Sequence, residues 1–157
     1  AFEPVVLSDD YDAIVISDYN KGFVTPESFR RLQSAVDSSI PIFVDSKKRD
    51  LRMFGNCFIK INETESFRAT TDPAQDIIVT LGSRGAKWRE QVFETREVDV
   101  YDVCGAGDVF LSSFVYGYLK HGDVPKAIQI ANMCASLSVT KMGTYILTKG
   151  DINDLCI

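Results

Sequence analysis

Four short apolar segments in the first half of the sequence constrain the fold more than any other feature. They lie at residues 13–17, 41–45, 57–61 and 76–81, and each has the length of a β-strand. Each is apolar almost throughout, whereas a strand with one face in water alternates apolar and polar residues. The pattern is therefore typical of strands buried on both faces of a parallel sheet.

Helices are predicted between and after these strands. Thr25-Pro26-Glu27 supplies a capping residue, a proline at the first helical position and an acid in the first turn. In the last third, apolar residues recur at helical spacing over residues 108–120 and again from 123 to 138. Three segments alternate more regularly and predict short antiparallel strands: residues 86–89, 91–94 and 96–100. Together these elements predict an α/β fold with a mainly parallel sheet flanked by helices.

Composition excludes several classes of protein. The chain has 157 residues, 45% hydrophobic and 25% charged, and a formal net charge of −5. We therefore expect a globular protein that binds neither nucleic acid nor an anionic membrane through bulk charge. No apolar run approaches the roughly 20 residues of a membrane span. The first ten residues lack the pattern of a signal peptide, and the four cysteines form no CxxC pair, so we expect reduced thiols and a cytoplasmic protein.

Polar loops follow the predicted strands where each one ends. In open sheets of parallel strands, ligands bind beyond the carboxyl ends of the strands. Four loops occupy such positions: residues 18–21, 45–47, 62–65 and 80–85. Because they would meet at one edge of the sheet, we expect a ligand site there.

The sharpest local signal is Asp102-Val-Cys-Gly-Ala-Gly-Asp108, which runs directly into an apolar helix. Gly105, Ala106 and Gly107 are small, so a ligand can approach their N–H groups, and the start of a helix attracts anions. Asp108 would repel a phosphate there unless it has a catalytic task, and a base for a substrate hydroxyl fits that task. A turn followed by a helix cap is the structural alternative for this segment.

Structural alternatives exist for the other polar residues too. Asn62 and Glu65 could cap a helix, or they could hold hydrated Mg²⁺ beside phosphates. Lys47 and Lys21 could be solvated surface charges or phosphate contacts. Cys104 has no histidine near it in sequence, which argues against a nucleophilic thiol.

In this order, the loops resemble those of the ribokinase-like (PfkB) family of sugar and nucleoside kinases, from about residue 13 to residue 148. Residues 102–108 are similar to the family's DTxGAGD signature, and Asn62-Glu-Thr-Glu65 is similar to its NxxE motif. Further similarities cover the nucleotide-side turn and the adenine-side helix and loop, at residues 79–85 and 131–144. Two segments are most similar to the heptose-7-phosphate kinase branch of the family: residues 17–22 and 44–47.

The resemblance implies a ribokinase-like fold and an ATP-dependent phosphoryl transfer to a hydroxyl of a sugar or sugar phosphate, as in ADP-heptose synthesis. Asp108 would be the base that takes the proton from the sugar hydroxyl. Gly105, Ala106 and Gly107 would form the anion hole for the γ-phosphoryl group.

The resemblance also implies the residues of the nucleotide, metal and acceptor sites. Asn62 and Glu65 would organise Mg²⁺, through water, and the phosphates. Asp102, with the carbonyl of Cys104, would hold a monovalent cation such as K⁺. Four residues would contact the nucleotide: Lys47, Thr80, Gly82 and Asn132. Two would face the acceptor: Asp18 and Lys21.

This chain departs from the family pattern in its length. Family members are considerably longer, so we expect residues 1–157 to be a single partial kinase domain, the nucleotide-binding C-terminal portion, without the N-terminal half and the lid. A non-catalytic nucleotide-binding or assembly module is the first alternative, favoured by the missing half and the shortened loops. An exposed sheet edge, where the absent strands would pair, would drive formation of a homo-oligomer. A nucleoside kinase on the same fold is the second.

Overall fold

One mixed sheet of six strands forms the centre of the computed structural model, which describes residues 11–155 and 157. The strands are adjacent in sequence order: β1 (Ile14–Asp18), β2 (Ile42–Ser46), β3 (Phe58–Asn62), β4 (Asp76–Thr80), β5 (Ala86–Trp88) and β6 (Gln91–Phe93). The first four pair in parallel, and β5 and β6 are antiparallel. The predicted parallel strands are therefore confirmed, each within one residue of its expected bounds.

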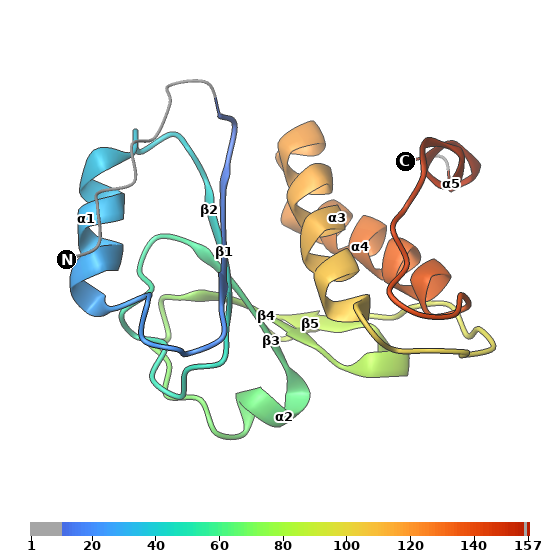
Figure 1. Cartoon of the computed structure of the whole chain (residues 1–157), viewed down its shortest axis with the longest axis horizontal. Helices are drawn as coiled ribbons and strands as arrows, with labels where there is room; N and C mark the ends of the chain where they lie inside the picture. The colour runs from blue at the N-terminus through green and yellow to red at the C-terminus, as the bar shows by residue number, and fades with distance from the viewer. Residues whose placement is uncertain (1–10, 156) are drawn as a thin grey trace.

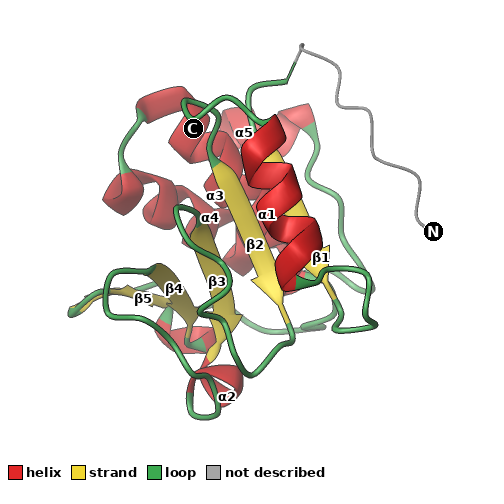
Figure 2. Ribbon diagram, turned by 90° about the vertical axis from the view of Figure 1, so that its left-hand side faces the viewer, coloured by secondary structure: helices red, strands yellow, loops and turns green. Residues whose placement is uncertain are grey.

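Helices cover both faces of this sheet (Figures 1 and 2). α1 (Pro26–Ala35) lies on one face, and α3 (Ala106–His121) and α4 (Val124–Ser138) lie on the other. Thr25 caps α1, with Pro26 at the first helical position as predicted. Three short elements complete the fold: α2 (Glu63–Ser66), the 3₁₀ turn η1 (Gly82–Arg84) and α5 (Lys149–Asp154).

β2 shows why the apolar runs fold as buried strands. All five of its residues are buried, and successive side chains point to opposite faces of the sheet. Phe43 packs toward α3, with its ring edge against Phe114, whereas Ile42 and Val44 belong to the cluster around Phe29 on the α1 face. The strand thus contributes to both apolar cores, each gaining about 25 cal/mol per Å² of buried apolar surface.

The predicted strand at residues 96–100 is wrong, because the structure has no strand there. β6 pairs with β5, and residues 96–98 and Val100 instead line a cavity. α3 begins at Ala106, two residues before the predicted start. α5 was not predicted, although Thr148 and Asp151 form a capping box at its start.

The outer edge of β1 pairs with no strand among the described residues, and its Val15 is 51% exposed. Within residues 11–155 and 157, no helix is both long enough and apolar enough to cross a membrane. The expectations made for residues 1–10 and for Cys156 concern positions outside the described residues.

Candidate functional site

The carboxyl ends of the parallel strands and the start of α3 lie at the same edge of the sheet (Figure 1). A cavity of about 580 Å³, which we call the polar cavity, opens at this edge. Eight of the predicted site residues line it: Asp18, Lys47, Asn62, Thr80, Gly82, Gly105, Gly107 and Asp108. The parallel sheet therefore brings together loops that are up to ninety residues apart in sequence.

The first turn of α3 forms one wall of the polar cavity. Gly105 is the N-cap in the left-handed region, with φ 78°, and its carbonyl accepts from the N–H groups of Asp108 and Val109 at 3.0 and 2.9 Å. The Ala106 N–H donates to the carbonyl of Val103. Within the described residues, the N–H groups of Gly105 and Gly107 have no acceptor. Two unpaired donors thus remain at the positive end of the α3 dipole, where an anion is stabilised.

Asp108 lies on the same turn and is exposed to the cavity. No group in residues 11–155 or 157 makes a hydrogen bond or ion pair with its carboxylate. A carboxylate without partners at the wall of a cavity can accept a proton from a ligand hydroxyl.

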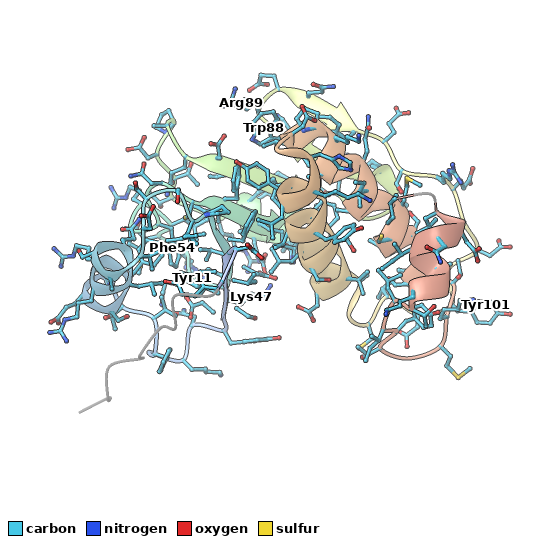
Figure 3. The ribbon with its side chains drawn as sticks, turned by 90° about the horizontal axis from the view of Figure 1, so that it is seen from above. Tyr11, Lys47, Phe54, Trp88, Arg89 and Tyr101 are labelled. Carbon is cyan, nitrogen blue, oxygen red and sulfur yellow. The ribbon has the colours of Figure 1, made fainter. Side chains whose placement is uncertain are left out.

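A chain of ion pairs crosses the floor of the polar cavity. Asp45, at the end of β2, accepts from Lys60 at 2.7 Å and pairs with Lys47 at 3.3 Å, and Lys47 reaches Glu65 at 2.8 Å. Burial of Lys47 opposes its charge, but its hydrogen bond to Glu65 and the negative charges of Asp45 and Glu65 outweigh that effect, so the pKa of Lys47 is raised. Figure 3 shows Lys47 in the middle of the view, between α1 and α3.

Lys60 is the site residue that sequence reasoning missed. It comes from the middle of β3, its side chain is 6% exposed, and it lines the polar cavity. A lysine inside a buried apolar run is the signal that could have found it, because lysine is almost never buried unless it is paired.

Asn62 and Glu65 form the helix cap that was one of their two predicted interpretations. The Asn62 side chain accepts from the Glu65 N–H, and the Glu65 carboxylate accepts from the Asn62 N–H, both at 2.8 Å. Among residues 11–155 and 157, no group of three or more His, Cys, Asp or Glu side chains is placed to hold a metal ion.

Asp18 ends β1 and is 4% exposed. One of its carboxylate oxygens accepts from the Ser46 hydroxyl at 2.8 Å and pairs with Lys48 at 3.3 Å, and the other accepts from the Asn20 N–H at 2.9 Å. This network joins the loops that follow β1 and β2. Lys21 is exposed and lines neither the polar cavity nor the second cavity described next.

A second cavity, of about 530 Å³, adjoins the first and shares Thr80, Gly82, Val103 and Gly107 with it. We call it the apolar cavity, because its wall is more apolar than that of the first. Six aliphatic or aromatic residues line it, beside polar residues such as Thr95, Arg96 and Glu97: Val98, Val100, Ala106, Phe110, Ala135 and Val139. Asn132 also lines it, and its side-chain amide donates to the carbonyl of Phe93 at 2.7 Å. The two cavities together suit an elongated ligand with one apolar and one anionic part.

Asp102 lies behind the first turn of α3 and lines neither cavity. Its two carboxylate oxygens accept from the N–H groups of Cys104, at 2.9 Å, and Gly143, at 3.1 Å. Thr144 packs against Gly105 so closely that a Cβ added to Gly105 would lie 2.8 Å from it. The carboxylate therefore fixes the segment before α3 against the loop that follows α4.

A family model and a curated relative match this chain, and solved structures share its fold. Residues 51–149 match the model of the pfkB family carbohydrate kinase. The bifunctional protein HldE of Nitratiruptor sp. is 30% identical over 167 residues, a match that covers 92% of this chain and 36% of that protein. Ribokinase from Thermotoga maritima has a TM-score of 0.72 at 17% identity, covering 92% of this chain and 56% of its own. Phosphofructokinase-2 from Escherichia coli, in complex with potassium, has a TM-score of 0.73 at 20% identity. The match covers 90% of this chain and 55% of that protein's chain. The chain thus spans little more than a third of the curated relative.

Proposed function

Because the chain belongs to the pfkB family of carbohydrate kinases, we propose that it carries the nucleotide-binding and catalytic part of an ATP-dependent kinase for a phosphorylated sugar. The observation that carries this proposal is the unpartnered Asp108 carboxylate beside the unpaired N–H groups of Gly105 and Gly107. A base and an anion-binding turn at one cavity wall are what transfer of a phosphoryl group to a hydroxyl requires.

The proposed reaction begins with ATP lying across both cavities. The adenine base of ATP occupies the apolar cavity beside Asn132, and the terminal phosphate lies at the first turn of α3. Asp108 takes the proton from the acceptor hydroxyl as the hydroxyl oxygen bonds to the γ-phosphorus. The bond from that phosphorus to the bridging oxygen breaks, and ADP leaves. The N–H groups of Gly105 and Gly107 stabilise the charge on the transferred group.

Two metal ions would assist the proposed reaction, Mg²⁺ at the phosphates and K⁺ near Asp102. Mg²⁺ would neutralise charge that develops on the phosphates. Asn62 and Glu65 would contact it through water, because each side chain already accepts a hydrogen bond from the backbone N–H of the other residue. For K⁺, the ion present in the phosphofructokinase-2 structure, the proposed ligands are Asp102 and the Cys104 carbonyl.

The acceptor we favour is a heptose 7-phosphate, which would make this a kinase of ADP-heptose synthesis. Support comes from the HldE protein that the chain resembles along 92% of its length, and from the loops at residues 17–22 and 44–47. Asp18 and Lys21 come from the first of these loops, on the acceptor side of the proposal. The same activity would place the protein in the cytoplasm, where ATP and sugar phosphates are found.

An assay of ADP formation tests the proposed activity. The chain is mixed with Mg-ATP and either heptose 7-phosphate, adenosine or no acceptor, and nucleotide binding is measured in parallel by calorimetry. We expect ADP formation that depends on heptose 7-phosphate. Formation that depends on adenosine would favour a nucleoside kinase instead, and ATP binding without turnover on any acceptor would favour a non-catalytic module.

The open edge of β1 supports a second candidate, an assembly module that forms a homo-oligomer. Val15 is half exposed on this edge strand, which presents unpaired backbone groups to another chain. Sedimentation velocity over a range of concentrations should show self-association that a Val15→Lys variant weakens. A monomer that persists at the highest concentration would contradict this candidate.

A further inference from the structure

We infer that Lys60 is a catalytic residue of the proposed kinase, whose ammonium contacts the terminal phosphate of the nucleotide, and that Asp45 is its positioning residue. The inference rests on the proposed function and names a cation of the phosphoryl site that lies outside the glycine-rich segment.

The burial of Lys60 needs an explanation. Its neighbours in β3, Ile59 and Ile61, are both buried core residues, and its own side chain is 6% exposed. Removing an ammonium group from water costs several kcal/mol, and a single buried ion pair often fails to offset that cost relative to an apolar pair. A buried lysine is therefore poor evidence for stability and better evidence for a task at the place its ammonium reaches.

That place is the first turn of α3. A Cβ added to Gly107 would lie 2.9 Å from Lys60 Nζ, so the ammonium occupies the space that any larger residue would fill. Lys60, Gly107 and Asp108 line the same cavity. The ammonium thus lies beside the turn that carries the unpaired N–H groups and the proposed base.

Asp45 pairs with the Lys60 ammonium at 2.7 Å and Asp108 lies in the first turn of α3, but the contact between the ammonium and the helix terminus is itself unfavourable. The start of a helix carries a partial positive charge, and a lysine placed there is destabilising, whereas cations stabilise the opposite end. Two positive charges, the α3 terminus and Lys60, converge on one wall of the polar cavity. An anion bound between them would be stabilised by both.

Asp45 holds the ammonium in place without using all its donors. Lys60 donates to Asp45 at 2.7 Å, and within the described residues this is the one hydrogen bond of its three N–H groups. Asp45 also pairs with Lys47, so its negative charge is shared between two cations. Lys60 therefore keeps donors for phosphate oxygens, and it takes no part in proton transfer, which belongs to Asp108.

Lys60→Met tests the inference by the selectivity of binding. Calorimetry compares a non-hydrolysable ATP analogue, with Mg²⁺, against adenosine, which lacks the phosphates. We expect the variant to bind the analogue about 10- to 100-fold more weakly, the range of a charged hydrogen bond, and adenosine with unchanged affinity. The matched control is Lys87→Met on β5, whose ammonium pairs with the exposed Glu90 and should change neither affinity.

A double variant guards against a loss of folding. Lys60→Met leaves Asp45 with Lys47 alone, whereas Asp45→Asn combined with Lys60→Met removes both buried charges of the pair. The double variant should fold and show the same selective loss. For Asp45, we expect Asp45→Asn to weaken binding of the analogue but not of adenosine, and Asp45→Glu to restore it in part.

The outcomes separate the two proposals. If the wild-type chain binds neither the analogue nor adenosine, the proposed function and this inference both fail. If the wild type binds the analogue and the folded Lys60 variants bind it equally well, the inference fails while the kinase proposal stands. Equal losses for the analogue and adenosine in folded variants would also overturn a role at the terminal phosphate.

Discussion

Two aspartates at the same edge of the sheet differ in almost every physical respect. Asp18, at the end of β1, is buried, and both of its carboxylate oxygens are engaged by Ser46, Lys48 and Asn20. Asp108, in the first turn of α3, is exposed and has no partner among the described residues. Both line the polar cavity, and both were predicted site residues.

This difference assigns a structural role to Asp18 and leaves Asp108 available for the reaction. A buried carboxylate with all its partners in place holds the β1 and β2 loops together, and its charge is already balanced. An exposed carboxylate without partners contributes little to stability and remains free to take a proton. Preorganised sites need both kinds of residue, because reacting groups must be held by supporting interactions that are themselves fixed.

Replacement of Asp108 should have the largest effect on activity and almost none on stability. In Asp108→Asn we expect the rate of ADP formation with heptose 7-phosphate to fall by about 10²–10⁴-fold, the usual contribution of a positioned base. Thermal unfolding followed by circular dichroism should change little: the side chain makes no hydrogen bond that the substitution removes, and its charge at the start of α3 contributes at most about 1 kcal/mol. Turnover within tenfold of the wild type would remove the proposed role of this residue.

Replacement of Asp18 should instead have its main effect on stability. Asp18→Ala removes the carboxylate from the partly buried Lys48 and the acceptor from the buried Ser46 hydroxyl, and we expect a loss of about 2–3 kcal/mol of unfolding free energy. Urea unfolding measures the change. The control is Asp37→Ala, an exposed aspartate that bonds within its own turn to Ser39 and should cost far less. A loss for Asp18→Ala no greater than that of the control would contradict the scaffold role.

Lys47 lies between the two cases and should show the smallest effect. Its pKa is raised above the ordinary 10.5 by Glu65 and Asp45 despite the opposing effect of burial. Because the pKa is higher in the folded state, the charged lysine contributes its full stabilisation at pH values below the pKa of the unfolded state. This contribution is lost as the pH rises through the pKa of the folded state. Its side chain is partly exposed, so the contribution should be at most about 1 kcal/mol.

The pH dependence of a Lys47→Met variant measures this contribution. We expect the variant to be less stable than the wild type at pH 8, with the difference shrinking progressively above pH 10.5. A difference that stays constant through this alkaline range would show that Lys47 stabilises the chain through packing rather than charge.

The parallel strands could be predicted because a run of consecutive apolar residues indicates a buried strand. Ile42, Phe43 and Val44 are apolar in succession, and only a strand covered on both faces buries all three. Residues 96–100 could not be placed in the same way. Their alternation favours a strand, but the segment lines a cavity between distant parts of the chain and has no strand partner among the described residues.

The candidate site could be predicted where its chemistry lies in one segment. Gly105, Gly107 and Asp108 are contiguous, and a glycine-rich turn before an apolar helix is visible in the sequence. Lys60 could not be assigned, because its ammonium reaches Gly107 only through the position of β3 beneath α3. The engagement of Asp102 by Gly143 was also hidden, since it joins residues 41 apart in the chain.

The central claim is that the first turn of α3 receives the terminal phosphate of a nucleotide, and Gly107→Val tests it most directly. A side chain there meets the Lys60 ammonium and fills the proposed phosphate position, whereas Gly55→Val, the control, meets nothing within 4 Å. Calorimetric titration with Mg²⁺ and a non-hydrolysable ATP analogue should show binding by the wild type and the control, and none by Gly107→Val. Equal binding by all three proteins would contradict the claim.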